Sequence, residues 1–168
     1  MLSRQNIHHV AALGLALSAA IISGASAQTP PAGAAPAAGP TPAERAIEYR
    51  QAVYKVVAGN FGPLSQAAQG KAEFKPEGAT RSAARLAQIA TFVGDAYPDI
   101  SKEGKTRALP AIWSNRKDFD QIVADFTTHT KTLAEVAENS SSAGDEFKAA
   151  VAAVGNDCKT CHDKFRSK

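Results

Sequence analysis

The sequence has few of the signals that mark nucleotide or nucleic-acid chemistry. It contains no alternating strand pattern, no Asn-Gly hairpin and no glycine-rich phosphate loop, so a nucleotide-binding α/β fold is not expected. Its 19 basic and 16 acidic residues give a formal net charge of only +3 and form no basic stripe, which argues against a nucleic-acid partner. Sulfur is scarce too: the chain has two cysteines and one methionine, Met1.

The N-terminal segment has the three parts of a secretory signal peptide. Arg4 supplies the positive start, residues 10–22 are almost wholly apolar, and residues 25–27 (Ala-Ser-Ala) form a small-residue cleavage site. We therefore expect residues 1–27 to be removed on export to the periplasm. The apolar stretch is too short to span a bilayer comfortably, so no membrane attachment is expected after cleavage.

Residues 28–41 are dominated by alanine, proline and glycine. A segment of that composition cannot bury a core, and we expect a flexible leader. The remaining residues, 42–168, are enough for one domain.

Hydrophobic spacing predicts four amphipathic helices in this domain. The first begins with a capping signal at 41–44 (Thr-Pro-Ala-Glu) and runs to a break or kink at 62–63 (Gly-Pro), after which it can continue. The second runs from about position 76 or 78 to Tyr97. A long loop is expected over 99–113, and Ser114 is expected to cap the third helix.

The fourth helix has the clearest pattern. Its apolar positions alternate at four and three residues: Phe147, Val151, Val154, Cys158, Cys161 and Phe165. Both cysteines therefore belong to the core-facing seam of this helix. The predicted fold class is all-α, an antiparallel four-helix bundle.

The two cysteines begin a C-x-x-C-H motif, Cys158 to His162, near the C-terminus. This order is the attachment signal of c-type haem. Thiols three residues apart on a helix can each add to one vinyl group of a haem, and His162 can reach the iron as an axial ligand. The alternative is a redox or metal-binding cysteine pair, but the chain lacks a second ligand pair for zinc and a βαβ pattern. The sequence thus predicts one covalently attached haem c.

Few residues are available for the second axial position of that iron. Electron-transfer cytochromes usually supply methionine there, and Met1 leaves with the signal peptide. Apart from His162, the processed chain keeps only His129, which is either a structural residue at the edge of an apolar face or a second ligand; we favour the structural role. A lysine ligand would have to lose its charge, which is costly. Five-coordinate iron is the expected state.

Three features of the sequence resemble one family of c-type cytochromes. They are the segment 46–51 (Ala-Ile-Glu-Tyr-Arg-Gln) followed by 60–62 (Asn-Phe-Gly), the segment 110–114 (Pro-Ala-Ile-Trp-Ser), and the haem motif at the extreme C-terminus. With these features, 42–168 is similar to the class II cytochromes c, the cytochrome c-prime family.

The resemblance implies roles for individual side chains. Arg50 and Gln51 on the first helix would contact the haem propionates, and Arg166 would follow the haem histidine. Tyr54, one turn later, would cover the iron on the distal side, although it could also be an ordinary bundle aromatic. The expected distal pocket is apolar and lined from Val53, Val57, Phe119 and Phe126.

These expectations describe a periplasmic haem protein that is not an enzyme. An apolar pocket favours small neutral gases, nitric oxide (NO) and carbon monoxide (CO), over anions, and electron transfer is compatible with it. The alternative is a low-spin one-electron carrier without a gas-binding role. A redox protein partner with an acidic surface could meet the basic residues around the haem motif, which more simply form a solvated helix end.

The resemblance also implies a possible homodimer, paired through the first two helices. The residues expected on the outer faces of those helices are Ala52, Lys55, Val56, Ala83 and Ala87.

Overall fold

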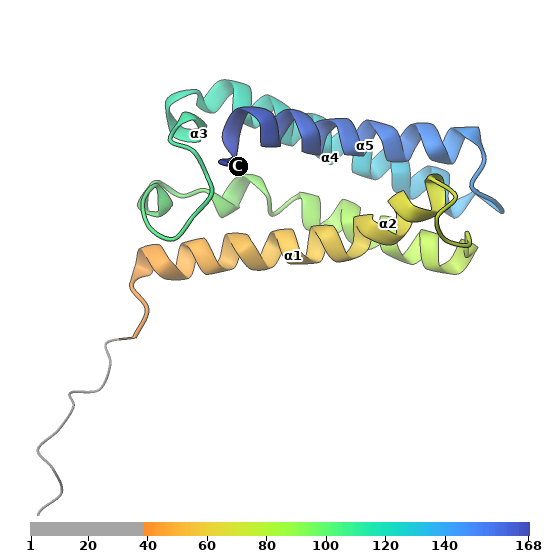
Figure 1. Ribbon diagram of the computed structural model, residues 1–168, viewed down its shortest axis with the longest axis horizontal. Helices are drawn as coiled ribbons and strands as arrows, with labels where there is room; N and C mark the ends of the chain where they lie inside the picture. Colours follow the sequence, from red (N-terminus) through yellow and green to blue (C-terminus); the bar gives the residue numbers. More distant parts are fainter. Residues whose placement is uncertain (1–38) are drawn as a thin grey trace, which may run out of the picture. The chain divides into compact units, whose positions relative to one another are not determined.

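Helices make up nearly all of the secondary structure in residues 39–168, the part of the chain that the computed structural model describes (Figure 1). In chain order the elements are α1 (Pro42–Ala68), α2 (Pro76–Ala90), the 3-10 turns η1 (Gly94–Ala96) and η2 (Asp99–Ser101), α3 (Ala111–Ser114), α4 (Arg116–Glu138) and α5 (Asp145–Phe165). Within 39–168 the only strand-like pairing is an isolated bridge between Ala108 and Arg166. The predicted signal peptide, 1–27, and nearly all of the predicted leader, 28–41, lie outside the described residues.

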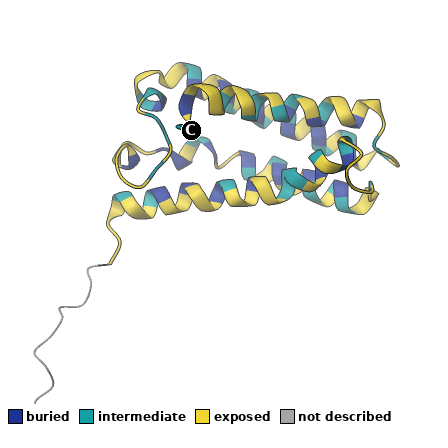
Figure 2. Cartoon of the chain, viewed as in Figure 1, coloured by how far each residue is buried: buried dark blue, intermediate teal, exposed yellow. Residues whose placement is uncertain are grey.

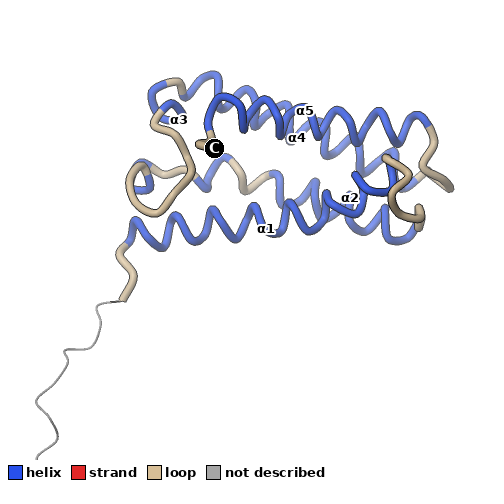
Figure 3. Tube along the Cα trace, in the orientation of Figure 1, coloured by secondary structure: helices blue, strands red, loops and turns tan. Residues whose placement is uncertain are grey.

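The four long helices form an antiparallel bundle, which confirms the predicted fold class. In Figure 1, α1 and α2 run in opposite directions as one pair, and α4 and α5 form a second pair. Figure 3 shows the long connection between α2 and α4 at one end of the bundle and the two shorter loops at the other. Among the neighbouring long helices, α1 and α5 make the sparsest contact, and the candidate site lies between them.

The start of α1 matches the capping signal in the sequence. The Thr41 hydroxyl accepts a hydrogen bond from the backbone N–H of Glu44 at 3.2 Å, and the Glu44 carboxylate accepts one from the Thr41 N–H at 2.7 Å. This reciprocal capping box satisfies two donors at the helix start. It fixes where α1 begins, and therefore which of its side chains face the bundle.

The proline in α1 bends the helix without ending it. The helix continues through Pro63 to Ala68, and its last turns are inclined to the rest in Figure 1. Leu64 and Ala67 are buried in the core, so their burial offsets the one backbone hydrogen bond that proline cannot make. The continued helix after a kink, one of the two expected outcomes, is the one observed.

The prediction that the second helix reaches Tyr97 was wrong, because α2 ends at Ala90. The next three backbone N–H groups bond to carbonyls three residues earlier, at 3.0 to 3.3 Å. Such bonds tighten the last turn of a helix. The chain then turns through η1, which places Tyr97 in a buried position at the end of the bundle.

The third long helix also begins differently from its prediction. Ser114 does not cap it but is the last residue of α3, and Asn115 occupies the capping position before α4. The expected loop over 99–113 contains η2 and the first part of α3. These short elements bring the chain from α2 across the bundle end and up to α4.

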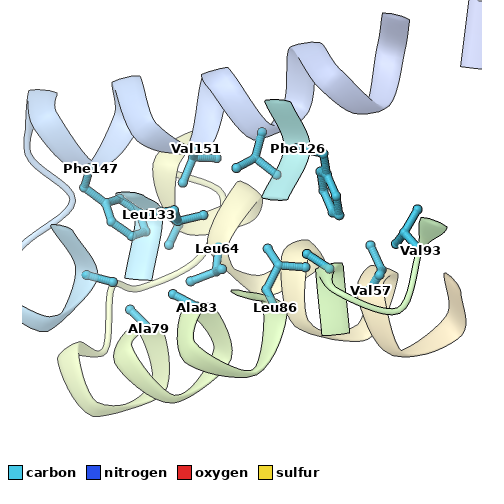
Figure 4. Close-up of a cluster of buried hydrophobic side chains, with 14 of the residues drawn as sticks. Val57, Leu64, Ala79, Ala83, Leu86, Val93, Phe126, Leu133, Phe147 and Val151 are labelled. Carbon is cyan, nitrogen blue, oxygen red and sulfur yellow. The ribbon is translucent and has the colours of Figure 1, made fainter. Parts of the chain in front are cut away.

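The core lies where all four long helices meet (Figure 4). Leu64, Leu86, Leu133 and Phe147, one from each helix, are at most 2% exposed, and the buried residues lie on the inner faces of the helices (Figure 2). The predicted seam of α5 is confirmed at Phe147, Val151, Val154 and Phe165, all buried. No helix within 39–168 is both long and apolar enough to cross a membrane.

One residue expected on the outer face of the second helix is misplaced. Ala83 is fully buried in the core, because the face of α2 that carries it also carries Leu86 and Ala90. It therefore cannot contribute to a dimer contact. Ala52 and Val56 are exposed on α1, as expected.

Candidate haem site

The C-x-x-C-H motif lies on the last two turns of α5, beside a cavity of about 700 Å³. Cys158, Cys161 and His162 all line this cavity. Both cysteines are half-buried free thiols, and His162 is exposed. The helix thus presents both thiols and the imidazole to the same space, as the four-and-three spacing predicts.

The walls of the cavity come from α1, α4, α5 and the connection after α2, and most of their side chains are apolar. Besides the two cysteines, the apolar lining residues are Tyr54, Val57, Ala58, Phe61, Val93, Tyr97, Ala108, Ile122, Val123, Phe126 and Phe165. Cavities with this character are typical of cofactor sites. A large, flat, mostly apolar group fits such walls.

Two of the four predicted pocket residues lie elsewhere. Val57 and Phe126 line the cavity, but Val53 and Phe119 do not. Val53 is next to Tyr54 on α1, so its side chain is turned by about 100° and packs in the core. Phe119 is fully buried behind the cavity wall, with its ring 5.5 Å from that of Phe165.

Burial controls the protonation of the two thiols. It raises the pKa of Cys158 and of Cys161 to about 11, with a further contribution from the Asp157 carboxylate at Cys158 and from Cys158 at Cys161. Both thiols are therefore protonated at neutral pH. Reactive cysteines in redox and hydrolytic sites have lowered pKa values instead, so this pair does not have the electrostatics of a catalytic thiol site.

The imidazole of His162 is held in its neutral form. Partial burial and the nearby guanidinium groups of Arg166 and Arg107 lower its pKa. The Arg166 Nη1 atom lies 3.1 Å from Nε2 and 3.4 Å from Nδ1 of the ring. A neutral imidazole is the form that coordinates metals, so the arginines favour the protonation state that an axial ligand requires.

Arg50 lies at the cavity wall but is already engaged with the protein. It is 3% exposed, and its guanidinium donates to the Ala96 carbonyl at 3.3 Å, to the Ser101 hydroxyl at 2.8 Å, to the Ser101 carbonyl at 3.4 Å and to the Thr106 hydroxyl at 2.8 Å. A guanidinium has five N–H donors, so these bonds leave Nε–H for a further partner. Gln51, which also lines the cavity, donates to the Lys105 carbonyl at 3.2 Å.

Tyr54 lines the cavity, as the resemblance implies, and it has a partner that the sequence did not indicate. The hydroxyl of Tyr97 lies 3.0 Å from the hydroxyl of Tyr54, and both rings border the cavity. Tyr97 was expected at the end of a helix with no site role. Tyr97 reaches the cavity only because α2 ends early and the chain turns at η1. The hydrophobic periodicity of the sequence does not predict that turn.

His129 lies outside the cavity lining. Its Nδ1 atom is 2.7 Å from the Asp157 carboxylate, and the imidazole is 42% exposed. Asp157 is itself a cavity residue, so the pair joins α4 to α5 beside the motif. This position agrees with a structural residue at the edge of an apolar face.

Comparisons with known proteins give one consistent result. The family model for Cytochrome C' matches residues 45–166. Cytochrome c' from Rubrivivax gelatinosus is 35% identical over 124 residues, which cover 73% of this chain and 95% of that protein. Cytochrome c prime from Shewanella frigidimarina matches in structure with a TM-score of 0.71 and 32% identity, over 75% of this chain and 97% of that one.

Two further similar structures carry bound gases. Both are variants of cytochrome c prime from Alcaligenes xylosoxidans, one a nitric oxide complex with a TM-score of 0.68 and the other bound to carbon monoxide with a TM-score of 0.67. Each is 28% identical and covers 75% of this chain and 97% of its own.

The family and the geometry agree on the cofactor. The cofactor of this family is a single covalently attached haem c, and here the half-buried thiols, the neutral imidazole and the apolar walls surround one cavity. The fold, the family match over 45–166 and the relatives at 30% identity and above lead to the same assignment. The chain belongs to the cytochrome c′ family.

Proposed function

We propose that this chain is a periplasmic haem protein that binds NO and CO at a five-coordinate iron. The observation that carries the proposal is the composition of the cavity wall: among its residues, His162 is the single histidine, and no methionine is present. The haem iron supplies the position at which a diatomic gas binds. The NO and CO complexes among the similar structures support this function.

Each residue of the motif has its own part in holding the cofactor. Cys158 and Cys161 would form the thioether bonds to the haem, and His162 would ligate its iron. The sulfur atoms and the imidazole come from adjacent turns of one rigid helix, so attachment and ligation are fixed relative to each other. Partial burial of His162, together with the charge of Arg166 in contact with it, lowers the pKa of the imidazole and favours its neutral form.

The propionate side of the haem is assigned to Arg50 and Gln51. Arg50 can offer Nε–H while its other donors hold the Ser101 and Thr106 side chains. Gln51 is exposed at the cavity rim, and its amide can exchange the Lys105 carbonyl for a carboxylate. A propionate accepts such charge-assisted hydrogen bonds.

Tyr54 is assigned to the distal side. It comes from α1, whereas His162 comes from α5, and both side chains line one cavity. With Val57 and Phe126 it gives the ligand an apolar surrounding. Such walls offer an anion nothing in exchange for its lost hydration, so neutral gases are favoured.

Four further expectations accompany this function. Export rests on the signal sequence at 1–27, and the absence of enzymatic activity rests on the lack of a distal His/Arg pair in the cavity wall described here. Electron transfer is compatible with the same haem. A homodimer paired through α1 and α2 stays a prediction, and a strictly monomeric mass by light scattering at tens of micromolar would contradict it.

Ligand selectivity tests the function. We expect the reduced protein to bind CO and NO with a shift of its visible spectrum, and the oxidised protein to bind cyanide weakly. As a matched variant, Val57→Thr keeps the shape of a buried wall residue but replaces one methyl group with a hydroxyl. Cyanide should then bind more tightly, while CO binding changes little. A spectrum that does not respond to CO would contradict gas binding and favour the one-electron carrier.

A further inference from the structure

Tyr97 is held firmly by residues that surround its ring and its backbone. The Arg50 guanidinium lies 4.7 Å from the ring centroid, and the Phe119 ring packs edge-on at 4.8 Å. Trp113 packs against the same ring at 6.1 Å, and its indole N–H donates to the Tyr97 carbonyl at 3.3 Å. Aromatic and cation–π contacts of this kind fix a side chain in one orientation. Tyr97 is 7% exposed.

Tyr54 depends on Tyr97 for its polar contact. The Tyr97 hydroxyl donates to the Tyr54 hydroxyl at 3.0 Å, and the two rings meet edge-on with centroids 6.4 Å apart. Tyr54 otherwise lies against apolar cavity residues, which restrain its position without directing it. The fixed member of the pair is therefore Tyr97. Both tyrosines line the cavity, and Tyr54 is the one that α1 contributes.

We propose that Tyr97 is a positioning residue that latches the Tyr54 side chain over the ligand position and so sets the rate and affinity of gas binding. The inference rests on the proposed function, because it concerns the ligand that must displace Tyr54. The structural basis is the hydroxyl pair, anchored through the Tyr97 ring to Arg50, Trp113 and Phe119.

Both hydroxyls keep their protons at neutral pH. Burial, together with the proximity of Tyr97, raises the pKa of Tyr54 well above its usual range, and burial also raises that of Tyr97. A tyrosine in water ionises near pH 10, so neither phenol loses its proton in the physiological range. The latch is accordingly a hydrogen bond between two neutral groups.

Conservative variants separate the latch from ring packing. Tyr97→Phe keeps every ring contact and removes only the hydroxyl, and Tyr54→Phe removes the other half of the same hydrogen bond. From the net strength of a single hydrogen bond, each variant should bind CO about two- to tenfold faster and more tightly. Because both variants break one bond, the double variant should change CO binding no more than either single variant.

Tyr49→Phe provides the matched control. Tyr49 is on the same helix as Tyr54 but is 45% exposed and lies outside the cavity lining. Its replacement should leave CO kinetics unchanged. Ultraviolet resonance Raman spectra of the tyrosines give an independent readout: the signature of a hydrogen-bonded pair should be present in the CO-free protein and disappear both in Tyr97→Phe and when CO binds.

The possible outcomes separate the proposed function from the latch. A wild-type haem protein that binds no CO would contradict the proposed function and the latch with it. A wild-type protein that binds CO at the same rate and affinity as Tyr97→Phe would overturn the latch alone. Additive effects of the two single variants would also overturn it, because they would show that the hydroxyls act separately.

Discussion

Replacing both Cys158 and Cys161 with alanine is expected to abolish covalent attachment of the haem. The thiols are the only two in the chain, so the variant has no other sulfur that can form a thioether. His162 remains and can still ligate the iron, but a haem held by one coordinate bond and apolar contacts should be extractable. Acid–acetone treatment should leave the colour with the wild-type protein and remove it from the double variant.

Intact-mass measurement makes the same prediction quantitative. The wild-type mass should equal that of the processed chain plus one haem, and the double variant should show the mass of the chain alone. Thr160→Ala is the control, since Thr160 lies between the two cysteines and is exposed. Colour that passes into the acid–acetone extract from the wild-type protein would contradict the covalent site.

Replacing Tyr54 with alanine is expected to have opposite effects on stability and on ligand binding. Truncating a fully buried large aromatic destabilises a fold by about 3–5 kcal/mol, and by less where neighbouring groups fill the space. Tyr54 is partly buried, so its truncation should cost no more than this. The same truncation removes the side chain that a ligand must displace. CO association should therefore be faster and its affinity higher than in the wild type, in stopped-flow measurements on the reduced protein.

Phe147→Ala distinguishes a distal residue from a core aromatic. Phe147 is 1% exposed and lies in the core cluster, outside the cavity lining. Its truncation should lower the free energy of unfolding by a similar amount without accelerating CO binding. If Tyr54→Ala is folded and five-coordinate yet binds CO like the wild type, Tyr54 does not cover the ligand position.

The helix that carries the C-x-x-C-H motif was predictable from sequence, because the spacing of its own residues indicates which side faces the core. The alternation of four and three residues from Phe147 to Phe165 places the cysteines on the inner face of α5 whatever the other helices do, and the buried seam confirms it. The capping box at Thr41 is equally local, since both of its hydrogen bonds lie within four residues.

The cavity wall was less predictable because it depends on contacts between distant segments. Tyr97 reaches Tyr54 only because α2 ends at Ala90 and the chain turns through η1. Arg50 was placed near the haem by family resemblance, but its bonds to Ser101 and Thr106 join residues about fifty positions apart. Hydrophobic periodicity does not encode such pairings.

The distal lining shows that a shift of one residue along a helix changes which side chain reaches the cavity. Val53 and Tyr54 are neighbours on α1, and both are apolar enough to be expected at the cavity. One residue of rotation sends Val53 into the core and leaves Tyr54 at the wall. Which of two adjacent residues faces the cavity depends on how α1 packs against the other helices, and this requires the structure.

The coordination state of the iron tests the central claim most directly. Resonance Raman and electron paramagnetic resonance spectra of the oxidised protein, recorded without added ligand, should show predominantly high-spin, five-coordinate iron with His162 as the single axial ligand. His129→Ala should leave these spectra unchanged, because His129 itself lies outside the cavity lining, where its imidazole pairs with the Asp157 carboxylate. A six-coordinate low-spin spectrum, and above all one that becomes high-spin in His129→Ala, would contradict the account.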